Sequence, residues 1–472
     1  MTYDLIVCGT GFASSFFLHK WLEKRPGSRV LVLERGARDD FWDQLEMGKN
    51  SSLESASLFS KSGLATKDWL FTVGLGGGSN CWWGQTPRMW PEDFQLFSRF
   101  GVGHDWPIGY DDLAPYYEEA EALISVAGPR DAPYPRRGAC PQPAHNLSGF
   151  DRRMAELFPG EWVAAPTARA SQPTDARGVC CANGVCGLCP VDAKFRVMNE
   201  LASLYDETDA VELRLGAEVL AVNVEGGRAT GITWSENGAE RSARGELVFL
   251  GMNALFNPQV LKLSGDDSPL TGRRLNEQAS LKLRVDFTDT DGFNGGSHIT
   301  GLGYMFYGGE QRRDRGSVLI ENYNAPAQLR SDRGKWTSRA VMKIVAENIP
   351  EDRNEVRLDE ETNQPVAHFE DHSEYAKRAL AEVPSEFIDQ LTGVSPIEDV
   401  RIDSEIAPSE GHIVGTTVMS GDPADGVVDG LMRHHRIANL VVGGSGAFPS
   451  GPGTNPSLTI AALSLRSASA LA

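Results

Sequence analysis

The first 36 residues alternate between short apolar runs and one longer segment with mixed polarity. Residues 4–9 (DLIVCG) have the character of a buried strand, residues 12–25 (FASSFFLHKWLEKR) of a helix, and residues 29–36 (RVLVLERG) of a second strand. Because two short apolar runs flank a helical segment, the pattern predicts a βαβ unit.

Further along, the pattern predicts a mixture of helices and strands. We expect a turn followed by a helix from about Asp111, loops over 129–178 with a short helix near 151–158, and consecutive strands over 211–238. Residues 246–265 predict a strand, a turn and a helix; 280–420 predict short strands with helices near 374–392; and 436–472 predict a strand, a Gly/Pro loop and a closing helix. The order favours an α/β fold, with a Rossmann-like unit and a second domain built on an antiparallel sheet.

The turn inside the βαβ unit has the spacing Gly9-x-Gly11-x-x-Ser14, and Glu34 ends the second strand. Gly9 suits a tight turn, and Gly11 allows the backbone to approach a pyrophosphate at the N-terminus of the helix. Glu34 can accept hydrogen bonds from ribose hydroxyls. A lone glycine pattern also occurs in ordinary strand–turn–helix units, but the whole combination favours dinucleotide binding.

A second glycine-rich stretch covers residues 73–94 (VGLGGGSNCWWGQTPRMWPEDF). Its glycines predict a loop whose backbone lies close to a flat or charged group. The alternative is a flexible surface loop, which the adjacent Trp82 and Trp83 make less plausible.

Charge and hydropathy narrow the class of protein. Lys and Arg number 45 and Asp and Glu 64, giving a net charge of −19, which argues against a nucleic-acid-binding face. No run reaches the roughly 18 apolar residues of a membrane span. The start, MTYDLIVCGTGF, lacks the basic segment of a signal peptide. We expect a protein that is cytoplasmic as synthesised, or exported in folded form with a partner subunit.

Four of the seven cysteines fall within ten positions, Cys180, Cys181, Cys186 and Cys189, inside the loop 177–192. Such clustering indicates metal or redox chemistry rather than a secreted disulfide framework. The interpretations left open are an iron–sulfur cluster, a structural zinc site, local disulfides that could include Cys140, and free thiols.

Several segments together resemble the glucose–methanol–choline (GMC) flavoenzymes. They are the βαβ unit, GLGGGS (74–79), LGMNALFNPQVLKLSG (250–265), GHIVGTTVMSGDPADGVVD (411–429) and GGSGAFPSGPGTNPSLTIAALSLRSA (443–468). The nearest likeness is to bacterial sugar and polyol dehydrogenase subunits and to pyranose oxidases. The resemblance implies an FAD-binding domain of residues 1–95, 205–265 and 430–472, and a substrate-binding domain of residues 96–204 and 266–429.

The resemblance also implies oxidation of an alcohol by hydride transfer to flavin N5, with His412 and Asn455 as the catalytic pair. A neutral imidazole is suited to take the hydroxyl proton, and Asn455 can hold the same oxygen. The plainer alternatives are a structural histidine and a helix N-cap at Asn455 with Pro456 in the first turn. The implied flavin contacts are Gly9, Gly11, Phe12, Ala13, Glu34, Arg35, Gly77, Gly78, Ser79, Asn80, Cys81, Val219, Gly251, Ala254, Gly446, Ala447, Asn455 and Pro456.

Some dehydrogenase subunits of this kind carry a similar cysteine run that resembles a [3Fe–4S] site. Adjacent side chains diverge, so one of Cys180 and Cys181 is expected to be spare, and three thiolates suit a three-iron cluster. The favoured reading is an FAD-dependent dehydrogenase whose cluster passes electrons to an external acceptor, such as a cytochrome or small partner subunit. The alternatives are an oxidase with a structural cysteine loop, and a non-redox lyase.

Many GMC enzymes bond a histidine of the glycine loop to the flavin. Here Cys81 stands at that position, in Gly76-Gly77-Gly78-Ser79-Asn80-Cys81-Trp82. We therefore expect FAD to be held without a covalent bond, and Cys81 to be a small packing residue.

Overall fold

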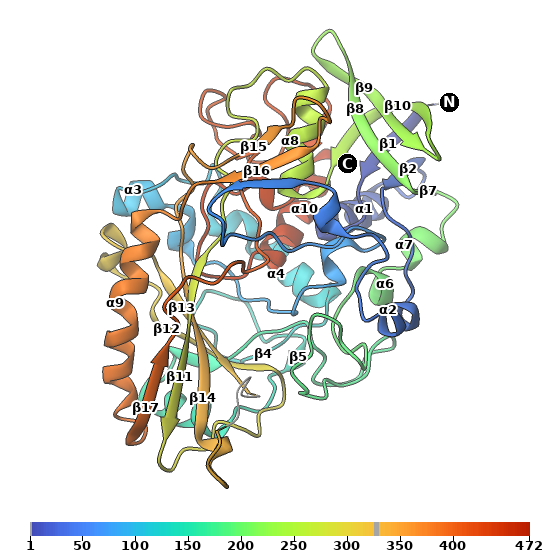
Figure 1. Ribbon diagram of the computed structural model, residues 1–472. Helices are drawn as coiled ribbons and strands as arrows, with labels where there is room; N and C mark the ends of the chain where they lie inside the picture. The colour runs from blue at the N-terminus through green and yellow to red at the C-terminus, as the bar shows by residue number, and fades with distance from the viewer. Residues whose placement is uncertain (1, 325–329) are drawn as a thin grey trace.

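The computed structural model describes residues 2–324 and 330–472. Its first sheet has seven strands in the order β7-β2-β1-β10-β9-β8, with β18 beside β10 (Figure 1). Five strands run parallel: β1 (Thr2–Cys8), β2 (Val30–Glu34), β7 (Val211–Leu215), β10 (Ala239–Leu250) and β18 (Leu440–Val442). β8 (Ala217–Glu225) and β9 (Arg228–Glu236) extend the sheet as an antiparallel meander.

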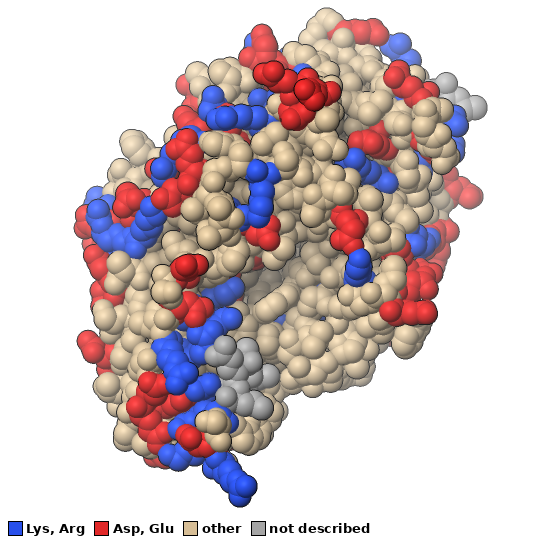
Figure 2. All heavy atoms as spheres, viewed as in Figure 1, with Lys and Arg blue, Asp and Glu red and all other residues tan. Residues whose placement is uncertain are grey.

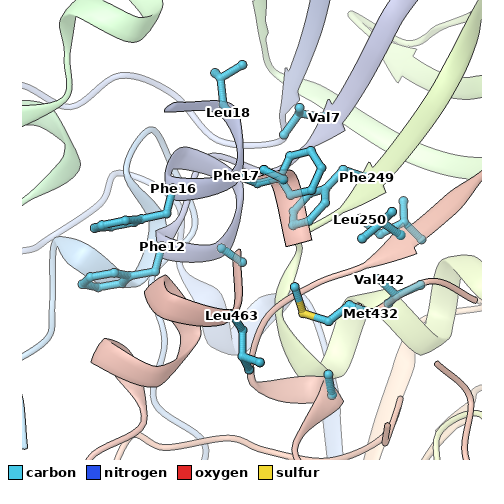
Figure 3. Close-up of a cluster of buried hydrophobic side chains, with 14 of the residues drawn as sticks. Val7, Phe12, Phe16, Phe17, Leu18, Phe249, Leu250, Met432, Val442 and Leu463 are labelled. Carbon is cyan, nitrogen blue, oxygen red and sulfur yellow. The ribbon is translucent and has the colours of Figure 1, made fainter. Parts of the chain in front are cut away.

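Helices α1 (Phe12–Lys24) and α10 (Ser457–Leu471) pack together beside this sheet. Figure 3 shows the apolar side chains at this junction, with Phe17 of α1 against Phe249 of β10 and Leu463 of α10 nearby. The Phe17 and Phe249 rings stack with centroids 4.2 Å apart. This core fixes the start of α1 at the carboxyl end of β1, as the predicted βαβ unit requires.

The second sheet is entirely antiparallel, in the order β17-β11-β14-β13-β12-β6. Its strands are β6 (Trp162–Ala164), β11 (Ala279–Phe287), β12 (Ile299–Phe306), β13 (Val318–Tyr323), β14 (Arg339–Ala346) and β17 (Ile397–Ile402). The long helix α9 (Glu374–Leu391) and the shorter α5 (Gly149–Leu157) cover one face and share an apolar core with it. The opposite face is therefore free to line a site.

Smaller elements connect the two sheets. β3 (Ser60–Gly63) pairs with β16 (Pro365–Phe369), which pairs with β15 (Glu355–Leu358), and β4 (Ala127–Gly128) pairs with β5 (Gln142–Pro143). The remaining helices are α2 (Phe41–Met47), α3 (Leu96–Phe100), α4 (Tyr110–Leu123), α6 (Val197–Glu200), α7 (Ser203–Asp206) and α8 (Asn253–Leu263). Short 3₁₀ turns are η1 (Ser55–Ser57), η2 (Gly77–Ser79), η3 (Pro91–Phe94), η4 (Glu310–Arg313), η5 (Trp336–Ser338) and η6 (Ser445–Ala447).

The predicted fold class is confirmed, and two local predictions need correction. The strand expected from residue 246 begins at Ala239, because its first half pairs with β9 in a hairpin. The stretch 129–178, expected as loops around one helix, also contains β5 and the sheet-edge strand β6. Strands of two or three residues carry too few positions for a period of two to show. The expected domain boundaries stay predictions.

Acidic and basic side chains are interspersed over the face seen in Figure 2, which is hollowed near its middle. The net charge of −19 is therefore not gathered into one patch on that face. Within residues 2–324 and 330–472, no helix combines the length and apolar character needed to cross a membrane.

Candidate active site

One continuous pocket of about 680 Å³ lies between the two sheets. At one end it is lined by the Gly9–Ala13 turn and Glu34, at the carboxyl ends of β1 and β2. At the other end it is lined by His412, Asn455 and side chains of the antiparallel sheet. A single cavity thus joins the predicted dinucleotide turn to the predicted catalytic pair.

The turn at the first end is made of closely spaced backbone. Gly9 has φ +89°, and a β-carbon there would lie 2.7 Å from the carbonyl oxygen of Gly251. Gly11 is the N-cap of α1, and no side chain caps its first amide groups. Gly77, with φ +49°, comes so near that its β-carbon would lie 2.9 Å from the α-carbon of Gly11. We call the backbone of Gly9, Gly11, Gly77 and Gly78 the glycine cradle.

Glu34 closes this end of the pocket. Its carboxylate accepts hydrogen bonds from the Thr10 hydroxyl at 2.7 Å and the Gly36 amide at 2.9 Å. Burial raises the pKa of Glu34, while these hydrogen bonds favour the ionised form. Thr10 was missed by sequence reasoning, although it occupies the variable position between the two glycines.

The second glycine loop is firmly packed rather than a flexible surface loop. Trp82 donates from Nε1 to the Phe195 carbonyl at 2.7 Å and meets the Phe12 ring edge-on at 4.6 Å. The buried Lys194 ammonium donates to the carbonyls of Asn80 and Trp82 at 2.9 and 2.8 Å. These contacts hold the loop against the start of α1.

The cradle fits FAD. Uncapped amides at the start of an uninterrupted 13-residue helix suit a pyrophosphate, and there is no room for a β-carbon at Gly9. The pocket is lined by these predicted flavin contacts: Gly9, Gly11, Phe12, Ala13, Glu34, Arg35, Gly77, Gly78, Cys81, Val219, Gly251, Asn455 and Pro456. Ser79, Asn80, Ala254, Gly446 and Ala447 are buried behind that lining.

His412 is held by a glutamine that sequence reasoning missed. Its Nδ1 lies 2.9 Å from Oε1 of Gln278, on the buried residue preceding β11. The Gln278 amide donates from Nε2 to the carbonyls of Pro452 and Thr454 at 2.7 and 2.8 Å. Because Nε2 of Gln278 is taken by two acceptors, its oxygen must face the imidazole. The network therefore assigns a proton to Nδ1 and leaves Nε2 of His412 as an acceptor.

Asn455 faces that free nitrogen. Its Nδ2 lies 3.4 Å from Nε2 of His412 and 3.4 Å from a carboxyl oxygen of Glu321. Its buried Oδ1 has no hydrogen-bond partner among the residues described. The side chain thus points into the pocket and does not cap a helix. The alternative interpretation of Asn455 as the helix N-cap does not match the structure, because α10 begins at Ser457 with Pro456 as N-cap.

The surroundings favour a neutral His412. Burial lowers the pKa of His412 to about 4, and the charges of Lys343 and Lys67 act in the same direction. Its backbone amide donates to the buried Glu277 at 2.7 Å, and Glu277 forms a buried ion pair with Lys67. The imidazole is therefore fixed in place and ready to accept a proton near neutral pH.

Three charged residues beside this pair were missed, and we call them the charged wall: Glu321, Lys343 and Glu410. Glu321 on β13 is the direct cross-strand partner of Lys343 on β14. Lys343 pairs with Glu410 at 2.7 Å. The signal was a charge within an apolar strand, in VLIENY and RAVMKIVA. Such a residue needs a partner or a function when buried.

The cysteine loop packs against the glycine loop. A β-carbon at Gly187 would lie 3.6 Å from Nε1 of Trp83 and 3.7 Å from the Cys81 carbonyl, both on residues that line the pocket. Cys186 is buried, and the Arg169 guanidinium donates to its sulfur at 3.8 Å. Burial raises the pKa of Cys186, whereas the charges of Arg169 and Lys194 lower it. Positive charge beside these sulfurs suits bound thiolates.

All seven cysteines are free of disulfide bonds, and Cys140 contacts Arg136 instead of a loop cysteine. A tetrahedral zinc holds each sulfur at about 2.3 Å, so its sulfurs lie roughly 3.8 Å apart. Within the described chain, no three of these cysteines bring their sulfurs within 4.8 Å of one another. This geometry does not support a zinc site. An iron–sulfur cluster places its cysteines on different irons and so needs wider spacing.

The fold and this pocket fit a dinucleotide-dependent oxidoreductase, and the comparisons with known proteins support one that acts on alcohols. Residues 350–464 match the family model described as GMC oxidoreductase. The chain is 26% identical to the fructose dehydrogenase large subunit of Gluconobacter japonicus, covering 100% of this chain and 98% of that protein. It is 27% identical to paromamine 6'-oxidase of Streptomyces fradiae, covering 100% and 91%. The chain is therefore similar to GMC oxidoreductases, and FAD is the cofactor that this similarity supports.

A solved structure supports the same fold. Pyridoxine 4-oxidase from Mesorbium loti superposes with a TM-score of 0.69 at 18% identity, over 99% of this chain and 98% of that one. The recognition of the family from the sequence is therefore confirmed, while the roles of individual residues stay predictions.

Proposed function

We propose that this protein is a dehydrogenase that oxidises an alcohol group of a sugar, glycoside or polyol and delivers the electrons to an external acceptor through a [3Fe–4S] cluster. The observation that carries the proposal is the unprotonated Nε2 of His412, which faces the pocket beside Asn455. FAD, when bound in the glycine cradle, supplies the hydride acceptor.

Converting CH–OH into C=O removes one proton and one hydride. His412 takes the hydroxyl proton on Nε2, since its Nδ1 proton is engaged by Gln278. Asn455 donates from Nδ2 to the same oxygen. This contact orients the substrate, and with it the carbon-bound hydrogen that leaves as hydride. The 3.4 Å contact between these two side chains is long enough to be replaced by contacts to a substrate oxygen.

Two observations support a polyhydroxylated substrate. The names of the relatives specify fructose in one case and the aminoglycoside fragment paromamine in another. The pocket also carries the buried carboxyl group of Glu321, whose single contact in the described chain is long and which a simple apolar alcohol would leave without a further partner.

The position of the cysteine loop supports an electron exit. The loop touches Trp83 and Cys81, which line the flavin pocket, so a cluster in the loop would lie beside the cofactor. Cys180, Cys181, Cys186 and Cys189 are the candidate ligands, and the cluster would pass electrons singly. A relative named as a large subunit supports a protein acceptor, a cytochrome or small partner subunit. Synthesis in the cytoplasm, with export alongside that subunit, fits this proposal.

Metal analysis under anaerobic conditions tests the cluster. Purified protein should be brown and hold about three irons per chain. Cys186→Ser should lose the iron and deliver electrons slowly to an artificial acceptor, while substrate still bleaches the flavin at a rate close to wild type. Cys140→Ser, outside the loop, is the matched control and should keep the iron. Zinc or no metal in anaerobically prepared wild-type protein would refute the cluster.

An oxidase is the second candidate, because relatives in both comparisons are named oxidases. A screen of sugars, glycosides and polyols separates the alternatives. Stoichiometric peroxide in air would favour the oxidase, and a flavin that no substrate bleaches anaerobically would favour a non-redox lyase. We expect bleaching by a sugar or polyol, with little peroxide.

A further inference from the structure

The charged wall of the pocket has an unusual carboxyl group. Glu321 is only 5% exposed, yet within the described chain its side chain has a single hydrogen-bond partner, the Asn455 amide at 3.4 Å. A buried carboxyl normally has several close partners, because losing water costs free energy that hydrogen bonds must offset. The group therefore has hydrogen-bonding capacity left for something that enters the pocket.

The register of β13 and β14 places the Glu321 side chain on the sheet face that lines the pocket. Glu321 and Lys343 are directly opposed on β13 and β14, so their side chains share the sheet face that is free of α9. Tyr323, two residues beyond Glu321, lines the same pocket. At the other side Asn455 bridges Glu321 to His412, with both contacts at 3.4 Å. Glu321 is thus one side chain away from the catalytic nitrogen.

Lys343 is a weaker candidate for the same task. Its ammonium is already engaged by Glu410 at 2.7 Å, and Glu410 also accepts from the Ser280 hydroxyl. This pair satisfies itself, which leaves Glu321 as the unmatched member of the wall. Burial raises the pKa of Glu321, whereas the charge of Lys343 lowers it, and in either protonation state the carboxyl group can accept a hydrogen bond from a hydroxyl.

We propose that Glu321 is a specificity-determining residue that binds the hydroxyl next to the one being oxidised, so that the pocket selects vicinal diols over simple alcohols. Asn455 holds the reacting oxygen, and the adjacent Glu321 reaches a hydroxyl on the neighbouring carbon. The ring and hydroxyls of a sugar then lie along the wall, beside the half-exposed ring of Trp83. This inference rests on the proposed alcohol oxidation.

Two probes that differ by one hydroxyl test it: trans-cyclohexane-1,2-diol and cyclohexanol. For the holoenzyme, the dissociation constant comes from changes in flavin absorbance on binding, and the reduction rate from anaerobic stopped flow. Wild type should favour the diol. Glu321→Leu should lose at least about tenfold of that preference, measured as the ratio of diol to cyclohexanol within each variant, since a site built for a hydroxyl loses that contact.

Two further variants separate specificity from structure. Glu321→Gln keeps hydrogen bonding at similar size and should retain most of the diol preference, which also keeps the test valid if the leucine variant folds poorly. Glu361→Gln, in an exposed turn, is the control and should match wild type.

The inference is overturned if wild type does not distinguish the probes, or if the preference survives in Glu321→Leu. Tighter binding of the diol without any bleaching of the flavin would contradict the proposed oxidation and leave the assignment of Glu321 standing.

Discussion

The two ends of the pocket differ in the groups that line them. The glycine cradle is backbone: amides at the start of α1, and a turn at Gly9 with no space for a side chain. The charged wall and the catalytic pair are side chains brought together from β13, β14 and the segments before α10. The cradle is encoded by two short glycine segments, whereas the wall and the catalytic pair depend on strand pairing and on contacts such as that between Asn455 and Glu321, which are 134 positions apart.

The comparison implies different sensitivities to substitution. At the cradle, adding almost any side chain should disturb cofactor binding, while the identity of the neighbouring side chains should matter little. At the wall, the backbone is regular antiparallel sheet and tolerates change, while single polar groups decide chemistry and stability. Substitutions at each end of the pocket test this contrast, and they differ in the size of the expected effect.

The largest effect is expected at the charged network that anchors the wall. Arg312 pairs with Asp93 at 2.9 Å and with Glu347, next to β14, at 2.9 Å, and all three side chains are fully buried. Arg312→Met should lower the free energy of unfolding by about 3–5 kcal/mol, because it leaves two carboxylates buried without a counter-charge. Denaturant unfolding measures the change.

Arg313→Met is the matched control for that network. Arg313 is exposed and, among the described residues, forms an ion pair with Glu310 alone, on the same turn, so its loss should cost no more than about 0.5 kcal/mol. The defect in Arg312→Met should shrink at lower pH, because protonation removes the buried charges. Equal destabilisation by both variants would show that the wall does not depend on this network.

The next effect concerns the catalytic end. His412→Ala should bind FAD and keep its fold, yet reduce the flavin with substrate at least about a hundredfold more slowly, the lower range for removing a general base. Stopped-flow absorbance gives the rate. His104→Ala, on a half-buried histidine outside the pocket lining, should reduce flavin like wild type. A His412→Ala enzyme as fast as wild type would show that another group takes the proton.

At the cradle, a single methyl group should weaken the cofactor. Gly9→Ala places a β-carbon 2.7 Å from a carbonyl oxygen at φ +89°, and the left-handed backbone alone costs an alanine about 1–2 kcal/mol. We expect at least about a tenfold loss of FAD affinity in titrations of apoprotein. Gly27→Ala, where the added β-carbon would have no described atom within 4 Å beyond its chain neighbours, should bind FAD normally. Unchanged affinity in Gly9→Ala would remove this turn from the cofactor site.

A smaller effect is expected from pH. Burial lowers the pKa of His412 to about 4, so its base form persists throughout neutral and mildly acidic conditions. The rate of flavin reduction should be constant from about pH 6 upward and fall as pH drops through about 4.

Folding stability also depends on pH. The buried histidines His145, His298 and His372 have pKa values of about 4, so folding stability falls as pH drops below about 6.5. Rapid pH-jump stopped flow separates the change in the rate of flavin reduction from the loss of folding stability. A half-maximal rate near pH 6.5 would contradict the assignment of His412 as the base.

The contrast also explains what the sequence could predict. Gly9, Gly11 and Glu34 follow local rules, so spacing and periodicity identified them together with the βαβ unit. His412 and Asn455 came from the family resemblance. Gln278 and Glu321 had no local signal strong enough, because their roles arise from which strands pair and in what register. The helix start after Asn455 was wrong because the amide contacts His412 and Glu321.

What the cysteine loop binds could likewise not be predicted from local spacing. Four cysteines in ten residues show that something is bound or exchanged there, yet spacing alone left zinc, iron–sulfur and disulfide alternatives. The separation of the sulfur atoms and the nearby Arg169 and Lys194 are tertiary facts, and they bear on the choice. The short helices α2, α3, α6 and α7 were missed for a simpler reason, since four to seven residues are too few for helical periodicity to show.

The smallest effect should come from Cys81, a cysteine beside the glycine cradle. Cys81 lines the pocket, half-buried, at the position where the family resemblance places a flavin-bonded histidine. Its sulfur donates weakly to the Gly78 carbonyl at 3.5 Å, within its own turn. If the cradle holds FAD by backbone contacts, Cys81→Ser should change neither FAD content nor affinity by more than about twofold.

After acid precipitation the yellow colour should stay in the supernatant, and the denatured chain should have the mass of bare polypeptide. Flavin fluorescence that travels with the wild-type chain on a denaturing gel, and is lost in Cys81→Ser, would mean that a side chain at the cradle does decide how the cofactor is held, and the contrast between the two ends of the pocket would fail at that point.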